Sequence, residues 1–158
     1  MKRKLKIHSS LACLALCTLQ AFAATNTPSF EQYPDPVVRL KSSPPPRLVS
    51  RQDREYRTRI AEASREEVNF SGHYVLSSFG CGSSCVMSFA LDKKSGKVSW
   101  LPFTVCCADS VATDAMPLSF RKDSRLLVVT GSRNEDGKGV YYYEFKRGEF
   151  VLVHEVEH

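Results

Sequence analysis

The sequence predicts a mainly β fold: an antiparallel meander with one N-terminal helix, stapled by disulfides. Short runs rich in β-branched and aromatic residues follow one another at spacings of about ten residues, with turn residues between them. A single stretch rich in Arg, Glu and Ala precedes these runs, and four cysteines lie among them. A meander of this kind is compatible with a sandwich, a barrel or a propeller-like arrangement.

Residues 1–23 have the three parts of a cleavable export signal. A basic start and an apolar stretch from Leu11 to Leu19 are followed by Ala21-Phe22-Ala23, a small-x-small cleavage site. The apolar stretch is far shorter than the ~20 residues that a membrane helix needs. A lipid anchor requires a small residue before its cysteine, whereas Cys17 follows Leu16. We therefore expect a periplasmic protein without stable membrane insertion.

Loss of the signal removes most of the net positive charge. The whole chain has 158 residues and a formal charge of +5, with 22 basic and 17 acidic side chains. Four basic residues and no acidic ones lie in the signal, which leaves 18 basic against 17 acidic side chains and a charge of +1. A nearly neutral chain gives no support to a nucleic-acid partner. The remaining length fits one domain with a modest core.

The first part of the exported chain divides into a Pro-rich lead-in at 24–46 and the start of a single β-rich domain at 47–158. The prolines disfavour helix, so the lead-in either drapes over the domain or acts as a plain linker. A helix is expected at 50–67, because Ser50 and Asp53 resemble a capping box and Tyr56, Ile60 and Ala63 form a thin apolar stripe. Its arginines form either a solvated face or a surface for an anionic partner. The arginines are Arg51, Arg54, Arg57, Arg59 and Arg65.

Seven strands are expected after the helix. The run at 126–130 is apolar on both faces, which indicates a central strand, whereas the acidic end of 150–156 indicates an edge strand. Residues 93–96 and 146–149 have the composition of hairpin turns. Residues 104–115 are polar and fit no regular element. The expected strands are 73–79, 86–91, 98–101, 118–120, 126–130, 139–145 and 150–156.

Four cysteines remain after signal removal: Cys81 and Cys85 in one loop, and the adjacent pair Cys106 and Cys107. An even number in an exported chain favours disulfides, and three connectivities are possible. We favour a cross-link between the loop and the pair, because a vicinal bridge between neighbours is strained. The local pairing remains the alternative. A four-cysteine zinc site fits the spacing poorly.

The same region offers weak candidates for catalysis and better ones for binding. Ser83 or Ser84 could act as a nucleophile with His73 as base and Asp109 to orient it, but no nucleophile elbow surrounds either serine. His73 is expected instead to be a half-buried strand residue. We therefore do not expect an enzyme, and no cofactor is implied. A structural envelope protein is a further alternative.

Two polar loops stapled to a small sheet form a plausible docking surface, because rigid loops lose little entropy on binding. The alternative is that the staples serve stability alone. The candidate partner-binding residues are Gly82, Ser83, Ser84, Asp109 and Ser110.

The strings NFSGHYVLSSFGCGSSC, LPFTVCC and PLSFRKDSRLLVVTGSRNE resemble a family of small secreted proteobacterial domains. The architecture also resembles the periplasmic immunity proteins that neutralise type VI secreted peptidoglycan amidases. In that group a serine-bearing loop enters the amidase active site. The resemblance implies an all-β domain that inhibits a peptidoglycan amidase effector, with Ser83 and Ser84, or Asp109 and Ser110, as the inserted residues.

Overall fold

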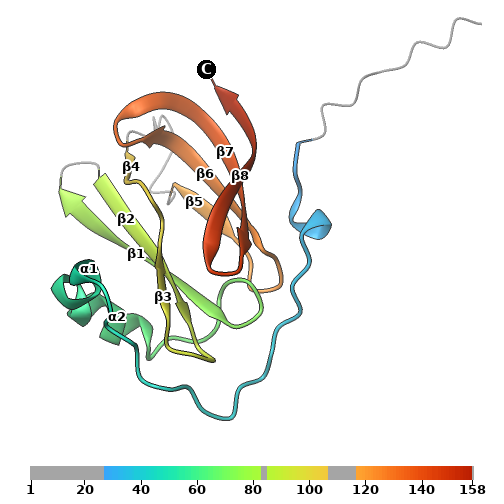
Figure 1. Cartoon of the computed structure of the whole chain (residues 1–158). Coiled ribbons are helices and arrows are strands. Elements are labelled where there is room, and N and C mark those ends of the chain that lie inside the picture. Colours follow the sequence, from blue (N-terminus) through green and yellow to red (C-terminus); the bar gives the residue numbers. More distant parts are fainter. Residues whose placement is uncertain (1–26, 83–84, 107–116, 158) are drawn as a thin grey trace, which may run out of the picture.

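The computed structural model describes residues 27–82, 85–106 and 117–157 (Figure 1). The export signal lies outside these ranges and stays a prediction. Across the described residues, no helix is both long and apolar enough to cross a membrane. The helices are the 3-10 helix η1 (Phe30–Gln32), α1 (Arg51–Glu55) and α2 (Arg57–Ala63). The strands are β1 (Tyr74–Gly82), β2 (Cys85–Asp92), β3 (Val98–Trp100), β4 (Val105–Cys106), β5 (Leu118–Phe120), β6 (Leu126–Arg133), β7 (Asp136–Lys146) and β8 (Glu149–Glu157).

All described strands join one antiparallel sheet, which confirms the predicted fold class. The order is β1-β2-β4-β6-β7-β8. In addition, β3 pairs with β2 next to the part of β2 that pairs with β4. In the same way, β5 pairs with β6 next to the part of β6 that pairs with β4. The expected strands all occur, with β6 central and β8 at an edge. One further strand, β4, was not predicted from the sequence, because two residues give no periodic pattern. It nevertheless joins the two halves of the sheet by pairing with both β2 and β6.

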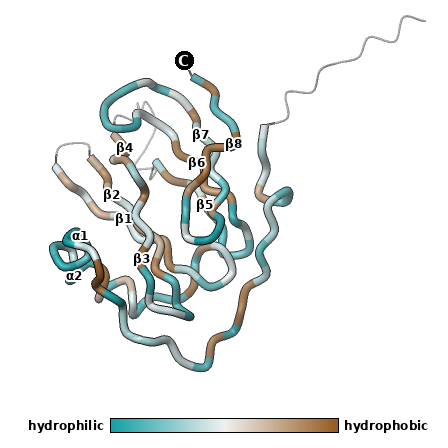
Figure 2. The backbone as a smooth tube through the Cα atoms, in the orientation of Figure 1, coloured by the Kyte–Doolittle hydropathy of each residue, from teal (hydrophilic) through white to brown (hydrophobic). Residues whose placement is uncertain are grey.

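The sheet curls, so that its two ends meet over a common core. The rings of Tyr74 and Phe145 have centroids 4.7 Å apart, although β1 and β7 are separated by three strands in the sheet order. Phe70, just before β1, also contacts Phe145 and is fully buried. Figure 2 shows hydrophobic stretches along the strands and a hydrophilic turn between β7 and β8. The curled face therefore encloses the larger of two hydrophobic clusters.

The smaller cluster lies on the opposite face of β1 and β2, beneath the helices. Successive strand residues alternate between the clusters: Leu76 faces the larger one, whereas Val75 packs with Ile60 and Ala63 of α2. The predicted apolar stripe of the helix therefore docks on the sheet as expected. Figure 1 shows α1 and α2 together on this side of β1 and β2.

The single helix predicted at 50–67 is wrong in two respects. It is broken at Tyr56, and its second half ends at Ala63. The Tyr56 ring packs against both Phe79 and Trp100, with centroids at 5.1 and 5.5 Å, and this aromatic contact coincides with the break. The capping box at Ser50 is present as predicted.

The described part of the lead-in, residues 27–46, drapes over the domain and does not hang free as a linker. Asp35 accepts a hydrogen bond from the buried Ser71 hydroxyl at 2.8 Å. Backbone hydrogen bonds join Asp35 to Asp123, Val38 to Gly72 and Arg125 to Tyr33. Figure 1 shows the lead-in passing along one side of the domain and beneath it to α1.

Candidate functional site

A disulfide closes the end of the β1–β2 hairpin, where Gly80, Cys81 and Gly82 of β1 are exposed. The ladder runs from Tyr74 opposite Asp92 to Gly82 opposite Cys85, with an irregularity around Cys81. A disulfide joins Cys81 to Cys85, whose Cα atoms are 5.2 Å apart. Gly82 has φ 145°, a conformation that suits glycine, and among the described residues no atom would lie within 4 Å of an added Cβ. Within the described part of the chain, nothing packs against Gly82 at the stapled end of the hairpin.

The Cys81–Cys85 disulfide corrects our preference for a cross-link between the two cysteine segments. The hairpin itself brings Cys81 and Cys85 within disulfide distance, so no second loop is needed. Cys106 is a free, buried thiol in β4, and Cys107 lies outside the described residues. The expectation that the two segments meet is nevertheless fulfilled at Cys106, because it lies directly opposite Cys85.

Four of the five predicted partner-binding residues, Ser83, Ser84, Asp109 and Ser110, lie outside the described residues. Gly82 is described and exposed at the end of β1. The other four belong to two segments: residues 83–84 directly follow Gly82, and residues 107–116 directly follow Cys106. Since β1, β2 and β4 are consecutive in the sheet, both segments leave the same end of three neighbouring strands.

The polar residues before β1 have structural roles. The Asn69 amide accepts a hydrogen bond from Leu76 N at 2.7 Å and donates to Leu76 O at 3.1 Å, so it pairs with the free edge of β1 as a neighbouring strand would. Gly72 has φ +72° and lies against the Pro36 carbonyl, where a side chain would collide. The NFSGHY string therefore anchors the lead-in to the sheet and protects an edge.

His73 lies just before the start of β1, whereas the stapled tip lies at the far end of this strand. Nine strand residues at about 3.3 Å each separate them by roughly 30 Å. Burial lowers the pKa of His73, as does the charge of Lys94, against the opposing effect of Asp92 and Asp35. The imidazole is half-buried as expected, with Nε2 3.6 Å from Asp92 Oδ1, but His73 lies in the turn before β1 and not in the strand. This position disfavours a catalytic pairing of His73 with the loop after Gly82.

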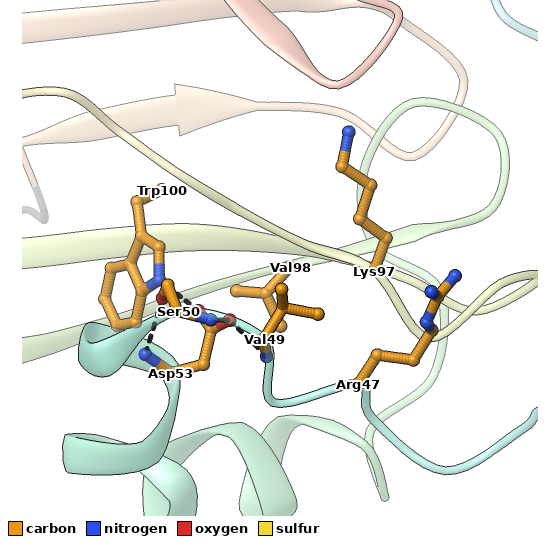
Figure 3. A pocket seen from close by; sticks show the side chains of 7 residues that line it. All are labelled: Arg47, Val49, Ser50, Asp53, Lys97, Val98 and Trp100. Carbon is orange, nitrogen blue, oxygen red and sulfur yellow. Dashed lines mark hydrogen bonds between the residues drawn. The ribbon is translucent and has the colours of Figure 1, made fainter.

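A pocket of about 340 Å³ lies between the start of α1 and β3 (Figure 3). Figure 3 shows Trp100 at one end, Arg47 and Lys97 at the other, and Val49 and Val98 between them. Asp53 and Ser50 complete the lining. Sequence reasoning missed this site, because Arg47 and Lys97 are 50 positions apart. The alternation of Val98 and Trp100, which places both on one face of a strand, was its one local signal.

Asp53 fixes the geometry of the pocket. Its Oδ2 accepts hydrogen bonds from the backbone N–H groups of Val49 and Ser50, at 2.9 and 2.8 Å. Its Oδ1 accepts the indole Nε1–H of Trp100 at 2.9 Å. Burial alone would raise the pKa of Asp53, but hydrogen bonds from Trp100, Ser50 and Val49 outweigh burial, and the pKa is lowered. The buried carboxylate is therefore ionised and fully engaged.

The arginine-rich helical face is exposed and partly self-paired. Arg59 forms an ion pair with Glu62 at 3.1 Å, and Arg54 donates to the Val49 carbonyl at 2.7 Å. These contacts fit a solvated face; an anionic partner for it stays a prediction.

In the described part of the chain, no group of His, Cys, Asp and Glu side chains is arranged to hold a metal ion. Comparisons of the chain with family models, with curated proteins and with solved structures find no match.

Proposed function

We propose that this chain is a periplasmic binding protein, and specifically an immunity protein that blocks a cell-wall amidase effector with its stapled hairpin tip. The observation that carries the proposal is the exposed, disulfide-closed end of the β1–β2 hairpin beside the end of β4. The serine-bearing loop at Ser83 and Ser84 would be the inserted element, with Asp109 and Ser110 beside it. No catalytic role is assigned to the chain itself.

Preorganisation of the stapled loop is the physical reason to expect that it binds a partner enzyme. A loop that is already closed by a disulfide loses little conformational entropy when it enters a cleft, so more of its contact energy appears as affinity. Glycines at Gly80 and Gly82 flank Cys81 and keep the tip narrow, because they add no side chains. A narrow, rigid projection suits insertion into an enzyme active site.

The test measures inhibition of a purified peptidoglycan amidase effector encoded next to this chain. We expect one-to-one binding and loss of hydrolysis with the wild-type protein. Ser83→Trp/Ser84→Trp should weaken binding by at least about a hundredfold, because bulky rings change the shape of the tip. Ser119→Trp, at an exposed site on β5, is the matched control and should bind normally.

Two results would contradict different parts of the proposal. Wild-type affinity in the Ser83→Trp/Ser84→Trp protein would remove the loop assignment while leaving the immunity role. Absence of any binding or inhibition by the wild-type protein would overturn the immunity role itself.

A further inference from the structure

We infer that the pocket beside Trp100 binds a carboxylate attached to an apolar group. The sources of this chemistry are the C-terminus of a peptide that ends in an apolar residue and a free aliphatic acid. This inference is independent of the proposed immunity role, since the pocket lies between the start of α1 and β3 and not at the hairpin tip.

The backbone brings the two cations of the pocket together. Arg47 directly follows the lead-in and Lys97 directly precedes β3, and the Arg47 N–H donates to the Gly96 carbonyl at 2.8 Å. Gly96 has φ +74°, and an added Cβ would collide with the Pro45 carbonyl. Glycine at this position therefore allows the close approach that places both cations at one end of the pocket (Figure 3).

Neither cation has a carboxylate partner within the described ranges. The ion pairs found there involve other residues, and no hydrogen bond from the Arg47 or Lys97 side chain occurs among those residues. The pocket's one acid, Asp53, is buried and already accepts three hydrogen bonds. The positive end of the pocket is therefore available to an external anion.

The remaining wall is apolar and requires more than a bare anion. Val49 is 71% exposed, and Val98 and Trp100 are half-buried beside it. The indole cannot turn freely, because its N–H is held by Asp53 and its ring packs against Phe89 with centroids 5.0 Å apart. A fixed aromatic and two valines next to two cations match a carboxylate that carries an aliphatic group.

Trp100 is the only tryptophan of the chain, so its fluorescence reports directly on the pocket. The experiment titrates the full exported chain at constant ionic strength with acetyl-leucyl-leucine, 4-methylpentanoate, acetyl-leucinamide or inorganic phosphate. We expect a saturable change with a carboxylate ligand, with a Kd of about 1 mM. The amide should bind at least about tenfold more weakly, because it lacks the charge that Arg47 and Lys97 would pair with.

Variants separate a specific site from general charge attraction. Arg47→Gln/Lys97→Gln should weaken binding of the carboxylates by about tenfold or more. Arg65→Gln/Lys146→Gln removes the same charge from two exposed positions outside the pocket lining and should leave binding unchanged. Thermal unfolding of each variant, followed by circular dichroism, checks that the fold is retained.

Each arm has a defined consequence. Binding of the peptide acid alone assigns a peptide C-terminus as the source, and equal binding of 4-methylpentanoate assigns a free acid. The inference is overturned if no carboxylate changes the fluorescence, if the amide or phosphate binds as well as the acids, or if the Arg47→Gln/Lys97→Gln protein binds with wild-type affinity.

Discussion

Asp53 shows how one buried side chain organises a surface feature. It closes the capping box of α1, holds the backbone of Val49 and orients the Trp100 indole. A carboxylate in this position satisfies donors from three different residues, which no apolar side chain could do. The start of α1, the residues just before it and β3 are therefore held together at the point where the pocket opens.

His73 gives a pH dependence whose sign follows from its environment. Its pKa is lowered in the folded protein, first by burial and then by Lys94. The unfolded chain therefore binds a proton more readily, so wild-type stability is expected to fall as pH drops below the unfolded value of about 6.5. The loss continues until the pH passes below the folded pKa.

The measurement compares urea unfolding of wild-type and His73→Gln proteins between pH 5 and pH 8. Groups that titrate in both proteins cancel in the difference, so the wild type should lose stability relative to the variant toward pH 5. A difference that stays constant with pH, or that changes in the opposite direction, would contradict the lowered pKa.

At the scale of elements, the position of β4 explains why the cysteine pairing was hard to predict. Cys85 has two neighbours with which it could pair: Cys81 within its own hairpin and Cys106 directly across from it on β4. Opposed residues of an antiparallel pair have Cα atoms about 4.5–5.5 Å apart, which is within disulfide range. The hairpin pairing is the one formed, and its short loop gives a stabilisation of about 2 kcal/mol.

Removal of Cys81 is expected to transfer the disulfide to β4. In a Cys81→Ser/Cys107→Ser protein, Cys85 and Cys106 remain opposite each other and should form a bond under air oxidation. The matched control, Cys85→Ser/Cys107→Ser, leaves Cys81 and Cys106 on strands separated by β2, roughly 10 Å apart, and should keep free thiols. Peptide mapping by mass spectrometry without reductant distinguishes the two. Free thiols in the first protein, or equal linkage in both, would contradict the strand register.

The strands and the helix-capping residues could be predicted because their signals are local. Alternation of side chains and turn residues locate β6, β7 and β8, and Ser50 with Asp53 marks the start of α1. Features that depend on contacts distant in sequence could not be predicted. The break at Tyr56 coincides with packing against Phe79 and Trp100, and the pocket needs Arg47 beside Lys97.

At the scale of the whole molecule, the lead-in completes the surface of the curled sheet. Ser71 and Ser124 are both buried, and both hydroxyls donate to the lead-in, Ser71 to Asp35 and Ser124 to the carbonyls of Phe30 and Tyr33. A buried hydroxyl without a partner is costly, so these serines indicate that the lead-in belongs to the folded unit.

A chain that begins at residue 40 should therefore be less stable than one that begins at residue 24. The truncation removes the partners of Ser71 and Ser124 and the backbone hydrogen bonds of Tyr33, Asp35 and Val38. At about 1 kcal/mol for each hydrogen bond, the loss should be about 3–6 kcal/mol in urea unfolding. Lys41→Ala in the longer chain, at an exposed lead-in position, should change stability little. Equal stability of the two chains would mean that the lead-in only rests on the domain, and the buried serines would then have to be satisfied by solvent.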